Sequence, residues 1–116
     1  MEIIMQNVPN YEMHAYHDPS FPVIFHIDPD PSYGSSSLPR WHEDIEILCV
    51  ISGEVGVNVD TTDINARPAE TVIINSNCMH TTSWDIETSK YYCLLINKQV
   101  CANAGVETVE IGRAHV

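Results

Sequence analysis

The sequence is poor in positive charge, with five Lys and Arg residues against sixteen Asp and Glu residues and a formal net charge of −11. A protein that binds nucleic acid neutralises phosphates with basic side chains, and this surface is expected to repel them. We therefore predict that these residues alone do not bind DNA tightly.

Long apolar runs are also missing. The chain has no stretch able to span a bilayer, and its opening residues lack the basic start and apolar core of a secretory signal. Of its 116 residues, 44% are hydrophobic and 18% charged, a balance typical of one globular domain. These features predict a soluble domain located in the cytoplasm, with no membrane partner.

No cysteine pair has the CxxC spacing that is common in zinc and redox sites. Three of the four cysteines lie in apolar runs, where a free thiol usually serves as a small buried side chain. The sequence therefore favours buried free thiols over zinc or redox chemistry at Cys49, Cys78, Cys93 and Cys101.

Short apolar runs separated by turns fill the middle of the chain. Residues 21–27 predict a first strand, and a proline-rich loop follows up to residue 40. Residues 45–51 and the alternating valines at 55, 57 and 59 predict a hairpin, and residues 71–74 and 90–96 predict two more strands. The even spacing of these strands is typical of an all-β sandwich or barrel.

The two ends differ from this middle part. Residues 1–20 predict an N-terminal arm, and residues 98–109 predict the start of a helix that leads away from the barrel. Helix-forming residues occupy positions 98–104, and Gly105 stands where a helix C-cap is common. The predicted barrel thus covers residues 21–97.

One stretch, residues 40–46 (RWHEDIE), resembles the first cupin motif, in which H-x-H is followed by a glutamate and then a glycine. His42, Glu46 and Gly53 keep that spacing, whereas Arg40 stands in place of the first histidine. Because a strand repeats its side-chain direction every two residues, His42 and Glu46 can face one cavity, and Asp44 shares their parity.

The second cupin motif supplies one more histidine after a turn and a strand. Here Pro68, the strand at residues 71–74 and His80 follow that order, with Glu70 in place of the usual glycine. The resemblance implies a double-stranded β-helix (cupin) barrel with a short C-terminal helix. It also implies that His80 points into the same interior as His42 and Glu46.

A closer resemblance, over roughly residues 10–108, is to the N-terminal cupin domain of AraC-family transcription regulators. Residues 41–47 (WHEDIEI), the first strand, His80 and residues 91–96 (YYCLLI) carry it. The resemblance implies a domain that senses a small molecule, sugar-like or another metabolite, often as a homodimer. DNA would be bound only through a C-terminal domain that these residues lack.

The predicted effector site comprises Arg40, Trp41, His42, Glu46, His80 and Trp84. A guanidinium grips carboxylates or hydroxyls but cannot ligate a metal, so Arg40 favours an organic effector with no cofactor. Arg40 could also reach solvent, and the two tryptophans could be ordinary core residues. In regulators of the arabinose type, an arm such as the one containing Tyr11, His14, Tyr16 and His17 can fold over the effector; a loose surface segment is the alternative.

Two other functions stay open. His42, Glu46 and His80 could hold iron, manganese or zinc in a stand-alone cupin isomerase or dioxygenase. Alternatively, these polar residues satisfy one another inside a domain that serves only for dimerisation. We expect a sensor without enzymatic activity.

The last seven residues, 110–116, fit no element of the family. Read as codons GAG ATC GGA AGA GCA CAC GTC, they resemble a common sequencing-library adapter, although a native tail could spell the same peptide. We predict that they are not native and make few contacts with the domain.

Overall fold

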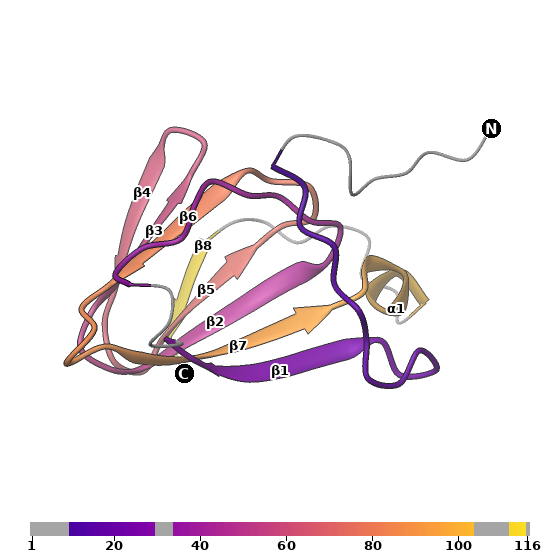
Figure 1. Ribbon diagram of the computed structural model, residues 1–116, viewed down its shortest axis with the longest axis horizontal. Helices are drawn as coiled ribbons and strands as arrows, with labels where there is room; N and C mark the ends of the chain where they lie inside the picture. The colour runs from indigo at the N-terminus through magenta and orange to yellow at the C-terminus, as the bar shows by residue number, and fades with distance from the viewer. Residues whose placement is uncertain (1–9, 30–33, 104–111, 116) are drawn as a thin grey trace.

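Two antiparallel sheets form the domain in the computed structural model, which describes residues 10–29, 34–103 and the backbone of 112–115 (Figure 1). The first sheet has five strands in the order β1-β7-β2-β5-β8, and the second has three in the order β4-β3-β6. The strands are β1 (Val23–Asp28), β2 (Ile45–Ser52), β3 (Val55–Val59), β4 (Thr62–Ala66), β5 (Glu70–Ile74), β6 (His80–Trp84), β7 (Lys90–Ile96) and β8 (Gly112–His115), and one helix, α1 (Lys98–Asn103), follows β7.

The hydrophobic core lies between the inner faces of the two sheets. In β3, alternate side chains are buried, as expected when one face of a strand packs on a core. Strands β2, β5 and β7 add their own inward rows, so both sheets contribute to one core. Its members are Leu48, Val50, Val55, Val57, Val59, Ala66, Val72, Ile74, Tyr91 and Cys93.

This arrangement confirms the predicted all-β cupin architecture with one short helix, in its jelly-roll form. Among the described strands the two sheets face each other without joining into a closed barrel. No helix in the described part of the chain is long and apolar enough to cross a membrane.

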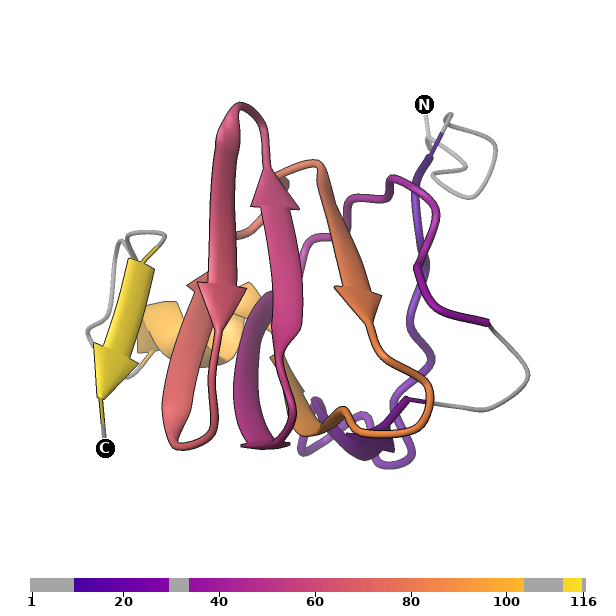
Figure 2. The ribbon, with the colours of Figure 1, turned by 90° about the vertical axis from the view of Figure 1, so that its left-hand side faces the viewer.

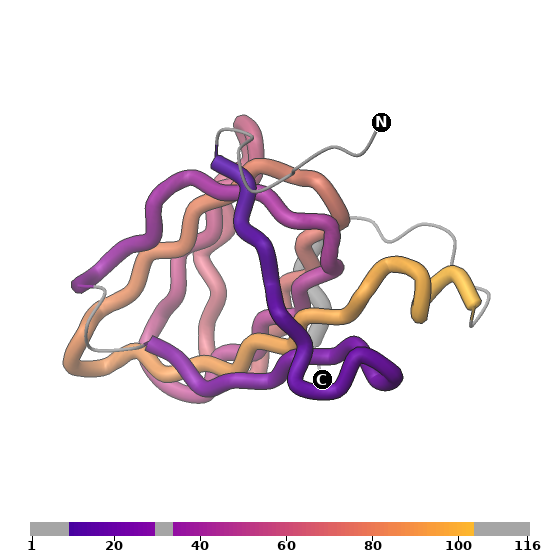
Figure 3. The backbone as a smooth tube through the Cα atoms, turned by 45° about the vertical axis from the view of Figure 1, so that its right-hand side comes forward, coloured from indigo at the N-terminus to yellow at the C-terminus, as the bar shows by residue number. Residues whose placement is uncertain are grey.

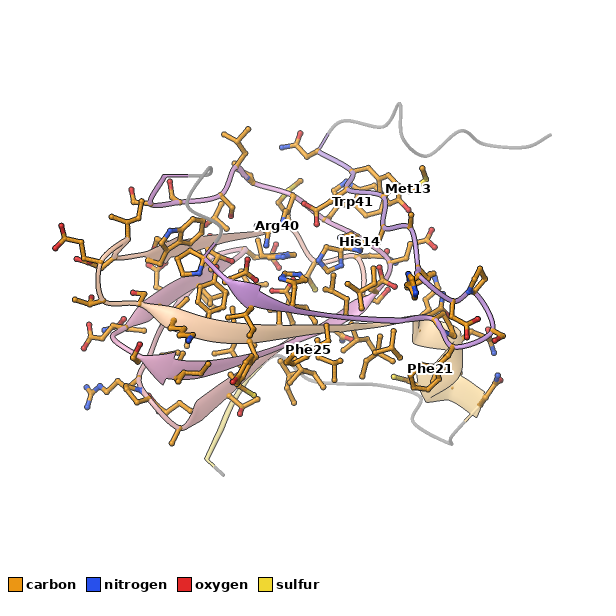
Figure 4. The ribbon with its side chains drawn as sticks, turned by 60° about the horizontal axis from the view of Figure 1, so that its bottom comes forward. Met13, His14, Phe21, Phe25, Arg40 and Trp41 are labelled. Atoms are coloured by element: carbon orange, nitrogen blue, oxygen red, sulfur yellow. The ribbon has the colours of Figure 1, made fainter. Side chains whose placement is uncertain are left out.

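The outer face of the five-stranded sheet is apolar as well. The register places Phe25 opposite Leu94, Leu94 opposite Ile47, and Ile47 opposite Ile73, in one row across four strands. Phe25 is 59% exposed, and its ring lies 5.2 Å from that of Tyr92. Figure 4 shows Phe25 on the side of the β1 and β7 ribbons away from Arg40 and His14.

Three of the described strands, β4, β6 and β8, were not predicted from the hydrophobic pattern. The sequences of β4 (TDINA) and β6 (HTTSW) are mostly polar, so they carry little hydrophobic signal. The first strand lies one to two residues later than predicted, and α1 ends at Asn103, whereas the proposed cap at Gly105 lies outside the described residues. All four cysteines are free, as predicted, but only Cys93 is fully buried.

The expectation that the C-terminal residues make few contacts is wrong for the described part of that segment. Gly112–His115 forms β8, which pairs antiparallel with β5 through partners from Glu70 to Ile73. Figure 2 shows β8 at the sheet edge farthest from the N-terminal arm. A free edge of β5 offers unpaired backbone groups to any extended segment, so this pairing does not depend on the identity of the side chains.

Candidate functional site

Glu46 is the centre of a buried polar cluster at the start of β2. Its Oε1 atom lies 3.4 Å from His42 Nε2, 3.8 Å from His80 Nε2 and 3.9 Å from Arg40 Nη2. Like Leu48 and Val50, Glu46 faces the inside of the sheet sandwich. The structure therefore brings together four of the six residues predicted for the site.

Backbone pairing explains how residues so far apart meet. Arg40 and His80 form an isolated antiparallel bridge, with Arg40 N donating to His80 O at 3.0 Å and His80 N donating to Arg40 O at 2.9 Å. This bridge holds the segment before β2 against the first residue of β6. His42 and His80 consequently lie edge to face, with ring centroids 4.9 Å apart.

Both histidines are oriented by backbone carbonyls. His42 Nδ1 lies 3.0 Å from Asp44 O, and His80 Nδ1 lies 2.8 Å from Cys78 O. Because a carbonyl only accepts, each Nδ1 carries the hydrogen, and each Nε2 lies on the side of the ring that faces Glu46. Neither Nε2 forms a hydrogen bond with acceptable geometry among the described residues.

The carboxyl group of Glu46 is ionised. Burial by itself would raise its pKa, but the facing His42 and His80 rings and the Arg40 charge outweigh burial and hold the pKa well below its usual range. A buried carboxylate of this kind needs cationic or hydrogen-bonding partners to remain charged.

The same three residues fit a divalent cation. The ligand atoms of His42, Glu46 and His80 all lie within 4.8 Å of one another, and two imidazoles with one carboxylate are a common set for iron, manganese or zinc. The unpaired Nε2 atoms are consistent with such a fit. A bound cation would supply Lewis-acid chemistry at this cluster.

Arg40 turns inward rather than toward solvent. Besides Glu46, its guanidinium contacts Ser37 Oγ and lies 3.3 Å from Glu12 Oε2. This orientation retains the positive charge beside the polar cluster, where it would oppose a metal cation and favour a carboxylate or hydroxyl ligand.

A cavity of about 910 Å³ adjoins the cluster. Arg40, Glu46 and Trp84 line it, whereas His42 and His80 lie behind its wall and Trp41 is outside it. Trp41 instead packs against Tyr11, with ring centroids 4.7 Å apart. The other lining residues are Tyr11, Glu12, Met13, His14, Ala15, Ile24, His26, Asp28, Ser36, Ser37, Leu38, Tyr91, Cys93 and Leu95.

The N-terminal arm forms one side of this cavity, and Figure 3 shows it crossing from the β6 side of the domain to β1. In this arm, His14 Nδ1 lies 2.6 Å from Asp44 Oδ2, and His14 Nε2 lies 2.6 Å from Glu12 Oε1. Tyr16 donates a further hydrogen bond to Asp44. Asp44 shares the parity of Glu46 but lies before β2, which begins at Ile45, and its carboxylate contacts the arm. Sequence spacing missed Glu12 and His14 as partners of the cluster.

Raising the pH should release the arm. Burial opposes protonation of His14, but its hydrogen bonds to Asp44 and Glu12 raise its pKa from 6.5 to about 9. The stabilisation from His14 is therefore complete below about pH 6.5 and is lost as the pH rises through about 9. We expect the fluorescence of Trp41, which packs against Tyr11 of the arm, to change over this range.

The matched controls are His14→Gln, which should remove this fluorescence transition, and His17→Gln at an exposed arm position, which should retain it. Tyrosine ionisation does not explain a change near pH 9, because the pKa of Tyr11 is raised and that of Tyr16 is about 12. A transition that persists unchanged in His14→Gln would assign it to another group.

The two facing sheets and the buried histidine–glutamate cluster define a cupin domain. The family of AraC-like ligand binding domains matches residues 21–108, and the chain belongs to this family. No curated protein matches the sequence significantly.

Solved structures support the fold. A cupin superfamily protein from Desulfitobacterium hafniense is similar, with a TM-score of 0.56 and 13% identity over 73% of this chain and 74% of that one. A Streptococcus pyogenes protein of unknown function gives a TM-score of 0.51 and 11% identity, with 55% of each chain covered. Bacillus subtilis oxalate decarboxylase gives 0.50 and 15% identity, with 63% of this chain but only 26% of the enzyme covered. The chain thus spans about half of the streptococcal protein and a quarter of the decarboxylase.

Proposed function

We propose that this domain is the effector sensor of an AraC-type transcription regulator, without enzymatic activity of its own. Its family is named for ligand binding, and the regulator would bind DNA through a further domain. Assembly as a homodimer belongs to the same proposal. The net charge of −11 supports the separation of roles, since this surface is poorly suited to phosphate binding.

The observation that carries the proposal is the cavity with Arg40 turned into it. Its volume of about 910 Å³ is typical of small-molecule sites, and its wall combines apolar side chains with polar and charged groups. Arg40 and Ser37 could bind the carboxylate or hydroxyl groups of a metabolite, and the ring of Trp84 could stack on a sugar-like ligand. Trp41 lies outside the cavity and packs against Tyr11 of the arm, so its proposed role is structural.

The second candidate is a metal-dependent cupin enzyme. The unpaired Nε2 atoms of His42 and His80, both directed toward Glu46, favour it. Against it stands Arg40, whose guanidinium lies 3.9 Å from the same carboxylate oxygen. Like charges this close repel even in a medium of effective dielectric constant about 20.

Metal analysis and ligand screening together separate the candidates. We expect the dialysed native protein to contain no stoichiometric iron, manganese or zinc held by His42 and His80, and a metabolite library to yield a compound that raises its Tm. Arg40→Met should weaken binding of that compound by about tenfold or more, since a charge-assisted hydrogen bond contributes about 1.5–3 kcal/mol. The exposed Arg67→Met serves as the control.

Stoichiometric metal that is lost in both His42→Ala and His80→Ala would overturn the sensor proposal and favour the enzyme. Binding of a metabolite that is equally strong in Arg40→Met would instead contradict the role given to Arg40.

A further inference from the structure

A second group of ligand atoms lies on the cavity wall formed by β1 and β7. The register of these strands places His26 directly opposite Cys93, and Asp28 follows on the same face of β1. His26 Nδ1 lies 2.5 Å from Asp28 Oδ2, and one ligand atom from each of the three residues lies within 4.8 Å of the others. All three residues line the cavity.

Burial differs across this group. Cys93 is 4% exposed, and the side chain of Asp28 is 18% exposed, whereas that of His26 is 45% exposed. Asp28 Oδ2 is shielded from solvent, yet it forms no hydrogen bond of acceptable geometry among the described residues. The group therefore has a closed inner side at Cys93 and an open outer side at His26 through which an ion can enter.

We propose that His26, Asp28 and Cys93 bind a divalent cation of the zinc type, at a site separate from His42, Glu46 and His80. An imidazole nitrogen, a carboxylate oxygen and a thiolate sulfur are all ligands of zinc, at about 2.0–2.3 Å. Three protein ligands would leave one position of a four-coordinate ion for water or a ligand, and all three residues line the cavity. The site shares no residue with the first cluster and does not depend on the proposed sensor function.

Binding changes the protonation of Cys93. Burial, followed by the negative charges of Glu46 and Asp28, raises the thiol pKa well above its ordinary value. The free site therefore holds a neutral thiol. When the cation binds, a metal–sulfur bond forms as the S–H bond breaks, and the imidazolium of His26 loses the proton of the ring nitrogen that ligates the ion, so two protons leave to solvent. The His26–Asp28 ion pair opens at the same time, so that both side chains face the ion instead of each other.

Titration with Co²⁺ provides the test, because cobalt gives a near-ultraviolet charge-transfer band only when a thiolate is bound. We expect this band to appear at one equivalent, to disappear on addition of Zn²⁺, and to be absent in Cys93→Ala. Mutation of a residue that only orients a metal ligand changes metal affinity by about 10–100-fold. Because His26 is itself a proposed ligand, His26→Ala should weaken the affinity for Co²⁺ at least as much. Its position is half-exposed and tolerates substitution.

Two controls separate the sites. Cys49→Ala removes a thiol that contacts Thr71 outside the cavity, and His80→Ala removes a ligand of the first cluster; both should keep the band. No band in the folded native protein, or a band that persists in Cys93→Ala, would overturn the proposal. In that case His26 and Asp28 form a simple ion pair beside a packed thiol.

Discussion

Glu46→Gln is expected to lower the free energy of unfolding by about 3 kcal/mol at neutral pH, the low end of the cost of removing one partner from a buried charged cluster. The substitution keeps the size of the side chain but removes the negative charge that faces His42, His80 and Arg40. Arg40 would then retain only Glu12 as an ionic partner in the described part of the chain. Urea denaturation of the native protein and the variant measures the difference.

The pH dependence of this difference provides a second readout. Because the pKa of Glu46 is lowered on folding, its stabilisation is complete above the ordinary carboxyl pKa of about 4.3 and is lost progressively as the pH falls below that value. The gap between native protein and variant should therefore shrink in acid. Glu43→Gln, at an exposed neighbouring position, should alter stability by less than about 0.5 kcal/mol. A Glu46→Gln variant as stable as the native protein would contradict an ionised cluster.

Gly53→Ala should destabilise the domain by a similar amount, about 3 kcal/mol. Gly53 has φ +66°, a conformation that costs other residues about 1–2 kcal/mol. A Cβ atom there would also lie 2.7 Å from the backbone oxygen of Thr88, which cannot move without shifting the turn before β7. Overpacking of this kind adds about 1–3 kcal/mol.

Gly34→Ala is the matched control for this prediction. Gly34 has nearly the same φ, +73°, but a Cβ atom added there meets no atom of the described residues within 4 Å. It should show only the conformational cost of about 1–2 kcal/mol. Thermal or urea unfolding of both variants measures the two effects separately, and equal losses would show that contact with Thr88 contributes nothing.

Sequence pattern predicted the strands that bury many apolar side chains and missed those that do not. β2 and β7 are rich in Ile, Leu, Val and Tyr, and both were predicted almost to their ends. In β6 the inward residues include His80 and Thr82, which look like turn or surface residues in isolation. Their burial comes from pairing with β3 and from the segment before β2, which are long-range contacts.

The site residues also divide into those that sequence pattern predicted and those that it missed. The spacing of His42 and Glu46 and the position of His80 follow a local motif, so sequence resemblance found them. The inward turn of Arg40 depends on Glu12 and Ser37, and the position of Trp41 depends on Tyr11. No spacing rule links an arm residue to the segment before β2, some thirty positions later.

The outer face of the five-stranded sheet is apolar, and its Phe25 and Ile27 side chains are more than half exposed. This face affects how readily separate molecules of the domain associate. Mutual repulsion from the net charge of −11 opposes contact between such faces on different molecules. That repulsion vanishes near the isoelectric point of about 4.6 and is screened at high ionic strength. Precipitation in acid should therefore precede acid unfolding, and preparations of the domain keep best in low-salt buffers near neutral pH.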